Sequence, residues 1–169
     1  MLDYLDELSD FTGELCFIAQ RNGPNLQYVI FRHFGEVDGA IPKAGLERPL
    51  AHAASGKVLL SFLREDEIVG IVNRNNQFDR EFRISPNSLL PELDAVRSTG
   101  IASSSPQFTP GLIGYATWLG ASSQETPCAI GVAVSTVRDG AKRERVISAL
   151  NDLHDRNTSD FGAYSVHAM

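Results

Sequence analysis

Two pairs of apolar runs constrain this chain most, because a short polar stretch joins the members of each pair. The first pair is 14–20 and 26–34, and the turn-forming sequence Arg-Asn-Gly-Pro-Asn lies between them. The second pair is 111–119 and 127–137. Short connections of this kind favour antiparallel hairpins. Because helical patterns lie before, between and after the hairpins, the sequence predicts an α+β fold with a mainly antiparallel sheet.

Apolar residues at helical spacing predict the helices. One helix has clear end signals, since Ser85-Pro86 offers a hydroxyl N-cap followed by proline and Gly100 is a favoured stop. The polar residues 73–84 are predicted to form a loop. The helices are predicted over residues 2–11, 53–63, 65–72, 86–99 and 141–155.

The length of 169 residues fits one domain. We place that domain at 1–157, and the polar residues 158–169 are predicted to form a flexible tail. The net charge is −6. A single short basic cluster, in residues 142–145, is interrupted by Glu144, so the chain is not expected to grip DNA by itself.

The sequence shows no motif for a metal or cofactor and no membrane-spanning segment. Cys16 and Cys128 sit among apolar residues and are predicted to be buried thiols. No histidine or cysteine has a metal-ligand spacing, so neither a metal nor a cofactor is predicted. No apolar run is long enough to span a bilayer, and the acidic N-terminus is not a signal peptide. The cytoplasm is therefore the expected location.

Candidate catalytic residues cluster around Ser55-Gly56-Lys57. A phosphate-binding loop is excluded, because Ala51 stands where that loop needs glycine and Val58 where it needs a hydroxyl. Ser55 with Lys57 or His52 leaves a small hydrolase as one hypothesis. The residues show no complete catalytic set, and the favoured interpretation is a protein that is not an enzyme.

Several motifs carry a resemblance to a known family. The segment 45–60 runs from Gly-Leu-Glu-Arg-Pro-Leu to Ala-Ser-Gly-Lys-Val-Leu-Leu, and 93–101 reads Leu-Asp-Ala-Val-Arg-Ser-Thr-Gly-Ile. Gly111 with Ala116 and the strand 132–135 follow in the same order. Together these motifs resemble the effector-binding domain of the isocitrate lyase regulator (IclR) family.

The resemblance implies a GAF- or profilin-like fold, in which a curved antiparallel sheet carries helices on both sides. It also implies a transcription regulator that senses a small organic or aromatic acid and assembles as a homodimer or homotetramer. DNA would be read only by a winged helix-turn-helix domain that this chain does not contain.

The family's pocket can be transferred only onto matching positions. Backbone amides at the helix start would hold a carboxylate, and the strand residues would share one face of the sheet. The resemblance places the effector-binding site at Ala54, Ser55, Ser104, Gly114, Ala133 and Ser135, with Leu112 and Ala40 as apolar walls and Arg48 and His52 nearby.

Some positions depart from the family pattern. His52 comes one residue late, and Ser103-Ser104-Ser105 replaces an acidic loop. An alternative function is therefore an interaction module without a ligand. In that hypothesis Phe34, Tyr115 and Trp118 would fill the pocket.

Overall fold

The computed structural model describes residues 2–33, 43–120 and 127–161. Its helices are α1 (Leu2–Thr12), the 3-10 turn η1 (Leu50–His52), α2 (Ala54–Leu60), α3 (Glu65–Phe78), α4 (Pro86–Thr99) and α5 (Asp139–Phe161). Its strands are β1 (Leu15–Asn22), β2 (Asn25–Arg32), β3 (Glu47–Pro49), β4 (Ile101–Ser103), β5 (Leu112–Leu119) and β6 (Cys128–Ser135).

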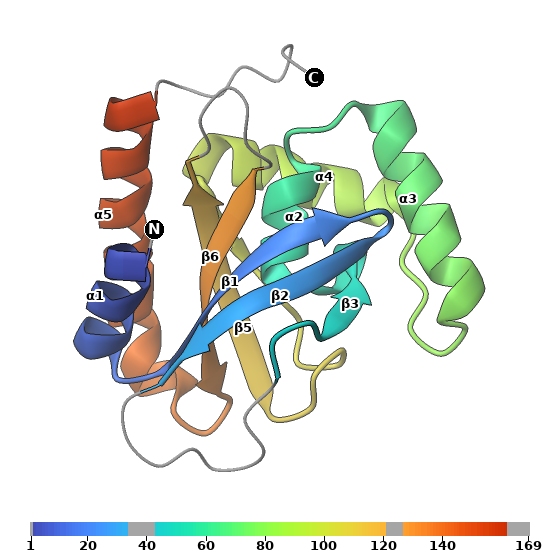
Figure 1. The fold of residues 1–169 in the computed structure, drawn as a ribbon. Helices are drawn as coiled ribbons and strands as arrows, with labels where there is room; N and C mark the ends of the chain where they lie inside the picture. The colour runs from blue at the N-terminus through green and yellow to red at the C-terminus, as the bar shows by residue number, and fades with distance from the viewer. Residues whose placement is uncertain (1, 34–42, 121–126, 162–169) are drawn as a thin grey trace.

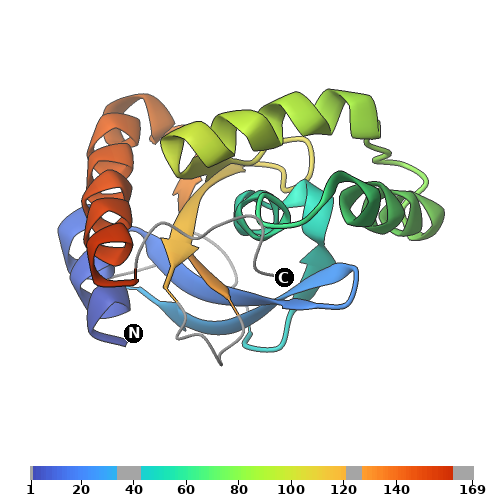
Figure 2. The same ribbon diagram turned by 90° about the horizontal axis from the view of Figure 1, so that it is seen from above.

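The strands form one sheet in the order β3-β2-β1-β6-β5-β4, and every neighbouring pair is antiparallel. The sheet curves, with α1 and α5 on one face and α2, α3 and α4 on the other (Figures 1 and 2). The predicted fold class, including helices on both sides of a curved sheet, is confirmed.

Alternating side chains on the central strands build a separate core on each face. On β1, Phe17 and Ala19 join the core beneath α2, whereas Cys16 and Ile18 join the core beneath α1 and α5. This follows from the two-residue period of a strand. Cys16 and Cys128 are both buried free thiols, as predicted.

The predicted elements are all present, but some bounds were wrong. Helix α3 continues to Phe78 through part of the predicted loop, because Asn75 is buried and its Nδ2 donates to the Pro24 carbonyl at 2.9 Å. Helix α5 continues to Phe161, past the predicted end at residue 155. Buried Asn157 fixes that extension, since its Nδ2 donates to the Trp118 carbonyl at 2.8 Å.

Helix α4 begins and ends where the sequence indicates. Pro86 occupies its first turn, and Gly100 ends it with a φ of 76°, in the left-handed region that glycine favours. The predicted cap is wrong in one detail, because the Ser85 side chain makes no capping hydrogen bond.

Candidate functional site

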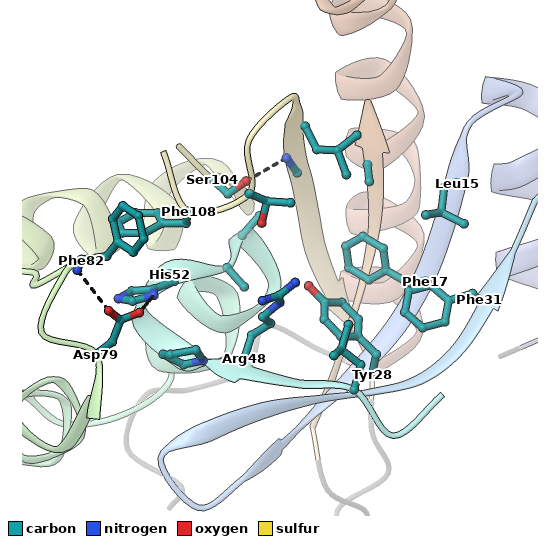
Figure 3. Close-up of a pocket in the computed structure, with 18 residues that line it drawn as sticks. Leu15, Phe17, Tyr28, Phe31, Arg48, His52, Asp79, Phe82, Ser104 and Phe108 are labelled. Carbon is teal, nitrogen blue, oxygen red and sulfur yellow. Dashed lines mark hydrogen bonds and ion pairs between the residues drawn. The ribbon is translucent and has the colours of Figure 1, made fainter. Parts of the chain in front are cut away.

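A cavity of about 220 Å³ lies between the concave face of the sheet and the η1–α2 segment (Figure 3). The sheet supplies Leu15 from β1, Leu112 and Gly114 from β5 and Ala133 from β6. The small residues Gly114 and Ala133 are cross-strand partners, so the floor of the cavity carries little side-chain bulk between them. Five further lining residues are aromatic: Phe17, Tyr28 and Phe31 from β1 and β2, and Phe82 and Phe108 from loops.

The rings on β1 and β2 form one packed group. Phe17 meets Tyr28 edge-on, with ring centroids 5.1 Å apart, and Tyr28 lies 5.2 Å from Phe31. These contacts hold an apolar surface open to the cavity.

Arg48 and Tyr28 form the polar group at this end. Burial raises the pKa of Tyr28, while the Arg48 charge and the neighbouring Ser55 hydroxyl act to lower it. Figure 3 shows the Arg48 guanidinium beside the Tyr28 hydroxyl. Arg48 is exposed on β3 and makes no ion pair with any residue that the structure describes. Its charge is therefore available to an anion in the cavity.

His52 closes another side of the cavity and is only 7% exposed. Its ring stacks on Phe108 with centroids 4.3 Å apart, and its Nδ1 lies 3.8 Å from the Asp79 carboxylate. Asp79 also accepts a hydrogen bond from the Phe82 amide at 3.1 Å. Burial lowers the pKa of His52, and the Asp79 carboxylate opposes that shift. Burial thus disfavours the charged imidazole, and Arg48 is the cationic residue of the lining.

Ser104 joins the loop after β4 to β5. Its Oγ accepts from the Gly114 amide at 2.8 Å, and its own amide donates to the Gly114 carbonyl at 2.9 Å. A Cβ on Gly114 would lie 3.1 Å from the Ser104 Oγ, so this approach is close-fitting. Where the resemblance expects an acid, the cavity wall carries a neutral hydroxyl.

The structure brings most of the predicted site residues together. Those that line the cavity are Arg48, His52, Ala54, Ser104, Leu112, Gly114 and Ala133. Ala40 lies outside the described residues.

Two predicted residues do not line the cavity. Ser55 is fully buried in α2, near the Tyr28 hydroxyl, and its Oγ makes no close hydrogen bond with any residue that the structure describes. Ser135 shares the sheet face of Ala133, as its spacing predicts, but it lies at the end of β6, where its Oγ accepts from the Val137 amide at 3.4 Å.

The aromatic walls and Asp79 were missed by the sequence reasoning. The alternation of Leu15 and Phe17 on β1 could have indicated Phe17. Phe82 and Phe108 lie in loops, where no periodic signal exists. The proposed filling residues are elsewhere: Tyr115 packs beneath α5 and Trp118 packs near Phe62, while Phe34 is outside the described residues.

The geometry does not assemble Ser55, Lys57 and His52 into a nucleophilic set. The Lys57 Nζ donates to the Glu92 carboxylate at 2.6 Å and to the Ser103 carbonyl at 3.1 Å. His52 faces Asp79 instead of Ser55. Within the described ranges, no three His, Cys, Asp or Glu side chains gather as a metal site. None of the helices described there has the length and apolar character needed to cross a membrane.

Several solved structures share this fold. The effector domain of a transcriptional regulator IclR from Acinetobacter sp. ADP1 matches with a TM-score of 0.83 and 22% identity, over 93% of this chain and 92% of that one. The C-terminal domain of the E. coli transcriptional regulator KdgR matches with a TM-score of 0.74 and 21% identity, over 95% and 94%.

A longer regulator also matches. The Thermotoga maritima IclR structure has a TM-score of 0.80 and 18% identity, and the match covers 95% of this chain but 66% of that one. No curated protein matches the chain significantly. The family model described as "Bacterial transcriptional regulator IclR C-terminal" matches residues 1–156. The chain therefore belongs to the family of IclR C-terminal domains of bacterial transcriptional regulators.

Proposed function

We propose that this chain is the effector-sensing domain of a transcriptional regulator and that it binds a small organic acid in the cavity beneath α2. The carrying observation is a mainly apolar cavity, with five aromatic residues in its walls and Arg48 at one side. Arg48 makes no ion pair with any residue that the structure describes. Binding pockets of this type combine apolar walls with a few polar groups that fix orientation.

The size of the cavity supports a small ligand. A dry apolar cavity of roughly 150 Å³ holds a benzene molecule. The cavity of about 220 Å³ thus has room for one ring or a short carbon chain together with a carboxylate. A guanidinium pairs with that group through two parallel hydrogen bonds.

The effector would act through assembly. We assign the sensing domain to residues 1–157 of a cytoplasmic protein that forms a homodimer or homotetramer. A ligand that binds one arrangement more tightly would shift the population towards it and so change the spacing of separate DNA-reading domains. Native mass spectrometry with and without ligand would measure both the assembly and the bound mass.

Thermal unfolding across small monocarboxylates tests the binding proposal. A ligand at about 100 times its Kd stabilises the folded state by roughly 2.7 kcal/mol. For a domain of this size that corresponds to a Tm increase of roughly 5–10 °C. Arg48→Gln should remove most of the increase, because the carboxylate loses its cation.

Arg74→Gln is the matched control, since Arg74 is exposed on α3 and does not line the cavity. It should keep the full ligand-dependent increase in Tm. If no acid stabilises the protein, or if Arg48→Gln responds like Arg74→Gln, the proposed binding mode is wrong.

A further inference from the structure

A second cavity, of about 330 Å³, lies directly beside the first. Its walls are mainly polar and include Lys57, Arg83, Ser88 and Glu92. Two residues, Ser104 and Phe108, line both cavities. They are therefore the partition between an apolar compartment and a polar one.

The two halves of this partition are held differently. Ser104 is fixed to β5 by its two hydrogen bonds with Gly114. The Phe108 ring is held by other rings, since it stacks on His52 at 4.3 Å and meets Phe82 edge-on at 5.9 Å. The Phe108 ring is thus the part of the wall that a substitution can remove without breaking the hydrogen bonds of β5.

We propose that Phe108 is the specificity-determining residue of this site and that its ring limits ligand length by closing the apolar cavity against the polar one. This inference rests on the proposed binding of an organic acid. The ligand class is then a short monocarboxylate whose far end is apolar, because that end meets aromatic carbon. A longer acid, or one with a polar far end, is excluded.

The polar compartment shows what removal of the ring would admit. The Lys57 side chain is 9% exposed, and its Nζ lies at this cavity with Glu92 and the Ser103 carbonyl as partners. Serine hydroxyls at 85, 88 and 105 line the same space. A terminal hydroxyl that reached this compartment would find both donors and acceptors. In the intact cavity the same hydroxyl would instead lie against the aromatic carbon of the Phe108 ring and would lose hydrogen bonds to water.

Calorimetric titration with two series of probes tests the proposal: straight-chain alkanoates of increasing length and their ω-hydroxy counterparts. In the wild type, Kd should fall about fourfold per added methylene until the chain fills the cavity, and then stop falling. An ω-hydroxy group should weaken binding by about tenfold or more. In Phe108→Ala, the chain length at which Kd stops falling should increase by about two carbons or more. The weakening caused by the ω-hydroxy group should fall to about twofold or less.

Phe82→Ala is the matched control. Phe82 contacts Phe108 and lines the apolar cavity but not the polar one. Its removal adds space but leaves the Phe108 ring stacked on His52 between the two compartments, so the ω-hydroxy penalty should remain. Phe108→Leu, a milder change at the same loop position, should give an intermediate limit on ligand length. It tests the same role of the ring if Phe108→Ala does not fold.

The outcomes separate the two proposals. If alkanoates bind and the length limit and ω-hydroxy penalty of Phe108→Ala equal those of Phe82→Ala, the role of Phe108 is wrong while acid binding stands. If no alkanoate binds the wild type, the binding of simple organic acids fails, and the inference fails with it.

Discussion

His52 shows how a single side chain can link the cavity to pH. The ring is buried between Phe108 and the Asp79 carboxylate. Burial is the main cause that lowers its pKa, with Asp79 acting in the opposite direction. The folded protein therefore resists protonation of His52, whereas the unfolded chain takes up that proton near pH 6.5.

The buried His52 makes the folded protein less stable at acidic pH. Below pH 6.5 the unfolded state binds more protons than the folded state, so stability falls as the pH falls. We expect His52→Gln to flatten the dependence of the unfolding free energy on pH between 5 and 7. The difference in slope should approach, at most, about 1.4 kcal/mol per pH unit. Urea unfolding at several pH values measures it.

Asp79→Asn provides the second variant for this prediction. It removes the carboxylate that raises the pKa of His52. The unfolding free energy should then continue to fall with decreasing pH over a range that extends to lower pH than in the wild type. Parallel pH profiles for all three proteins would show that His52 does not control the dependence.

Individual site residues were predictable only where the chain has a pattern. His52 stood out because it comes just before a helix start, and Ala133 was placed in the site by the motifs that carry the family resemblance. Phe82 and Phe108 could not be found this way, because their positions come from loops that meet only in three dimensions. Ser55 was misplaced because a short helix can turn a hydroxyl into its packed side as easily as into a cavity.

At the scale of elements, the contact between α2 and η1 positions the roof of the cavity, which is the η1–α2 segment opposite the concave face of the sheet. Gly56 lies so close to the Leu50 backbone that a Cβ added there would overlap the Leu50 carbonyl group. Glycine is required at position 56 for this close approach and not for an unusual φ. A side chain at this position would push α2 away from η1 and distort the roof.

Gly56→Ala should therefore lower the unfolding free energy by about 3 kcal/mol or more, because backbone atoms must move. The matched substitution is Gly70→Ala in α3, where an added Cβ meets nothing within 4 Å. That change should stabilise the protein by about 0.5–1 kcal/mol, since alanine favours the helix. Chemical denaturation of both variants tests the pair. Equal effects would mean that α2 does not pack on η1 as described.

Element types were predictable from the sequence, but some ends were not. Periodicity and turn residues located the helices and both hairpins. The extensions of α3 and α5 depend on Asn75 and Asn157, polar residues whose partners lie far away in the sequence. Arg97 acts in the same long-range way, since its Nε donates to the Ser61 carbonyl at 2.8 Å and joins α4 to the end of α2. Local patterns carry no information about such partners.

At the scale of the whole molecule, one sheet separates two cores and belongs to both. Leu60 is fully buried in the core beneath α2, and Leu150 is fully buried in the core beneath α5. Trp118, the single tryptophan of the chain, lies in the Leu60 core. Because each central strand supplies side chains to both faces, we expect the two cores to unfold together.

Leu150→Ala tests this expectation from the side opposite the tryptophan. Removing a buried leucine side chain costs about 2–5 kcal/mol. For a domain of this size the Tm should fall by roughly 5–15 °C. Trp118 fluorescence should report the same midpoint as far-UV circular dichroism, although the substitution lies across the sheet. Leu60→Ala, in the tryptophan's own core, should also give coincident midpoints.

Two midpoints in Leu150→Ala, with the fluorescence transition unmoved, would show that each face of the sheet is stabilised independently. An effector bound beneath α2 could then not stabilise the helices on the far face, and its signal would have to pass through the sheet edges or loops instead.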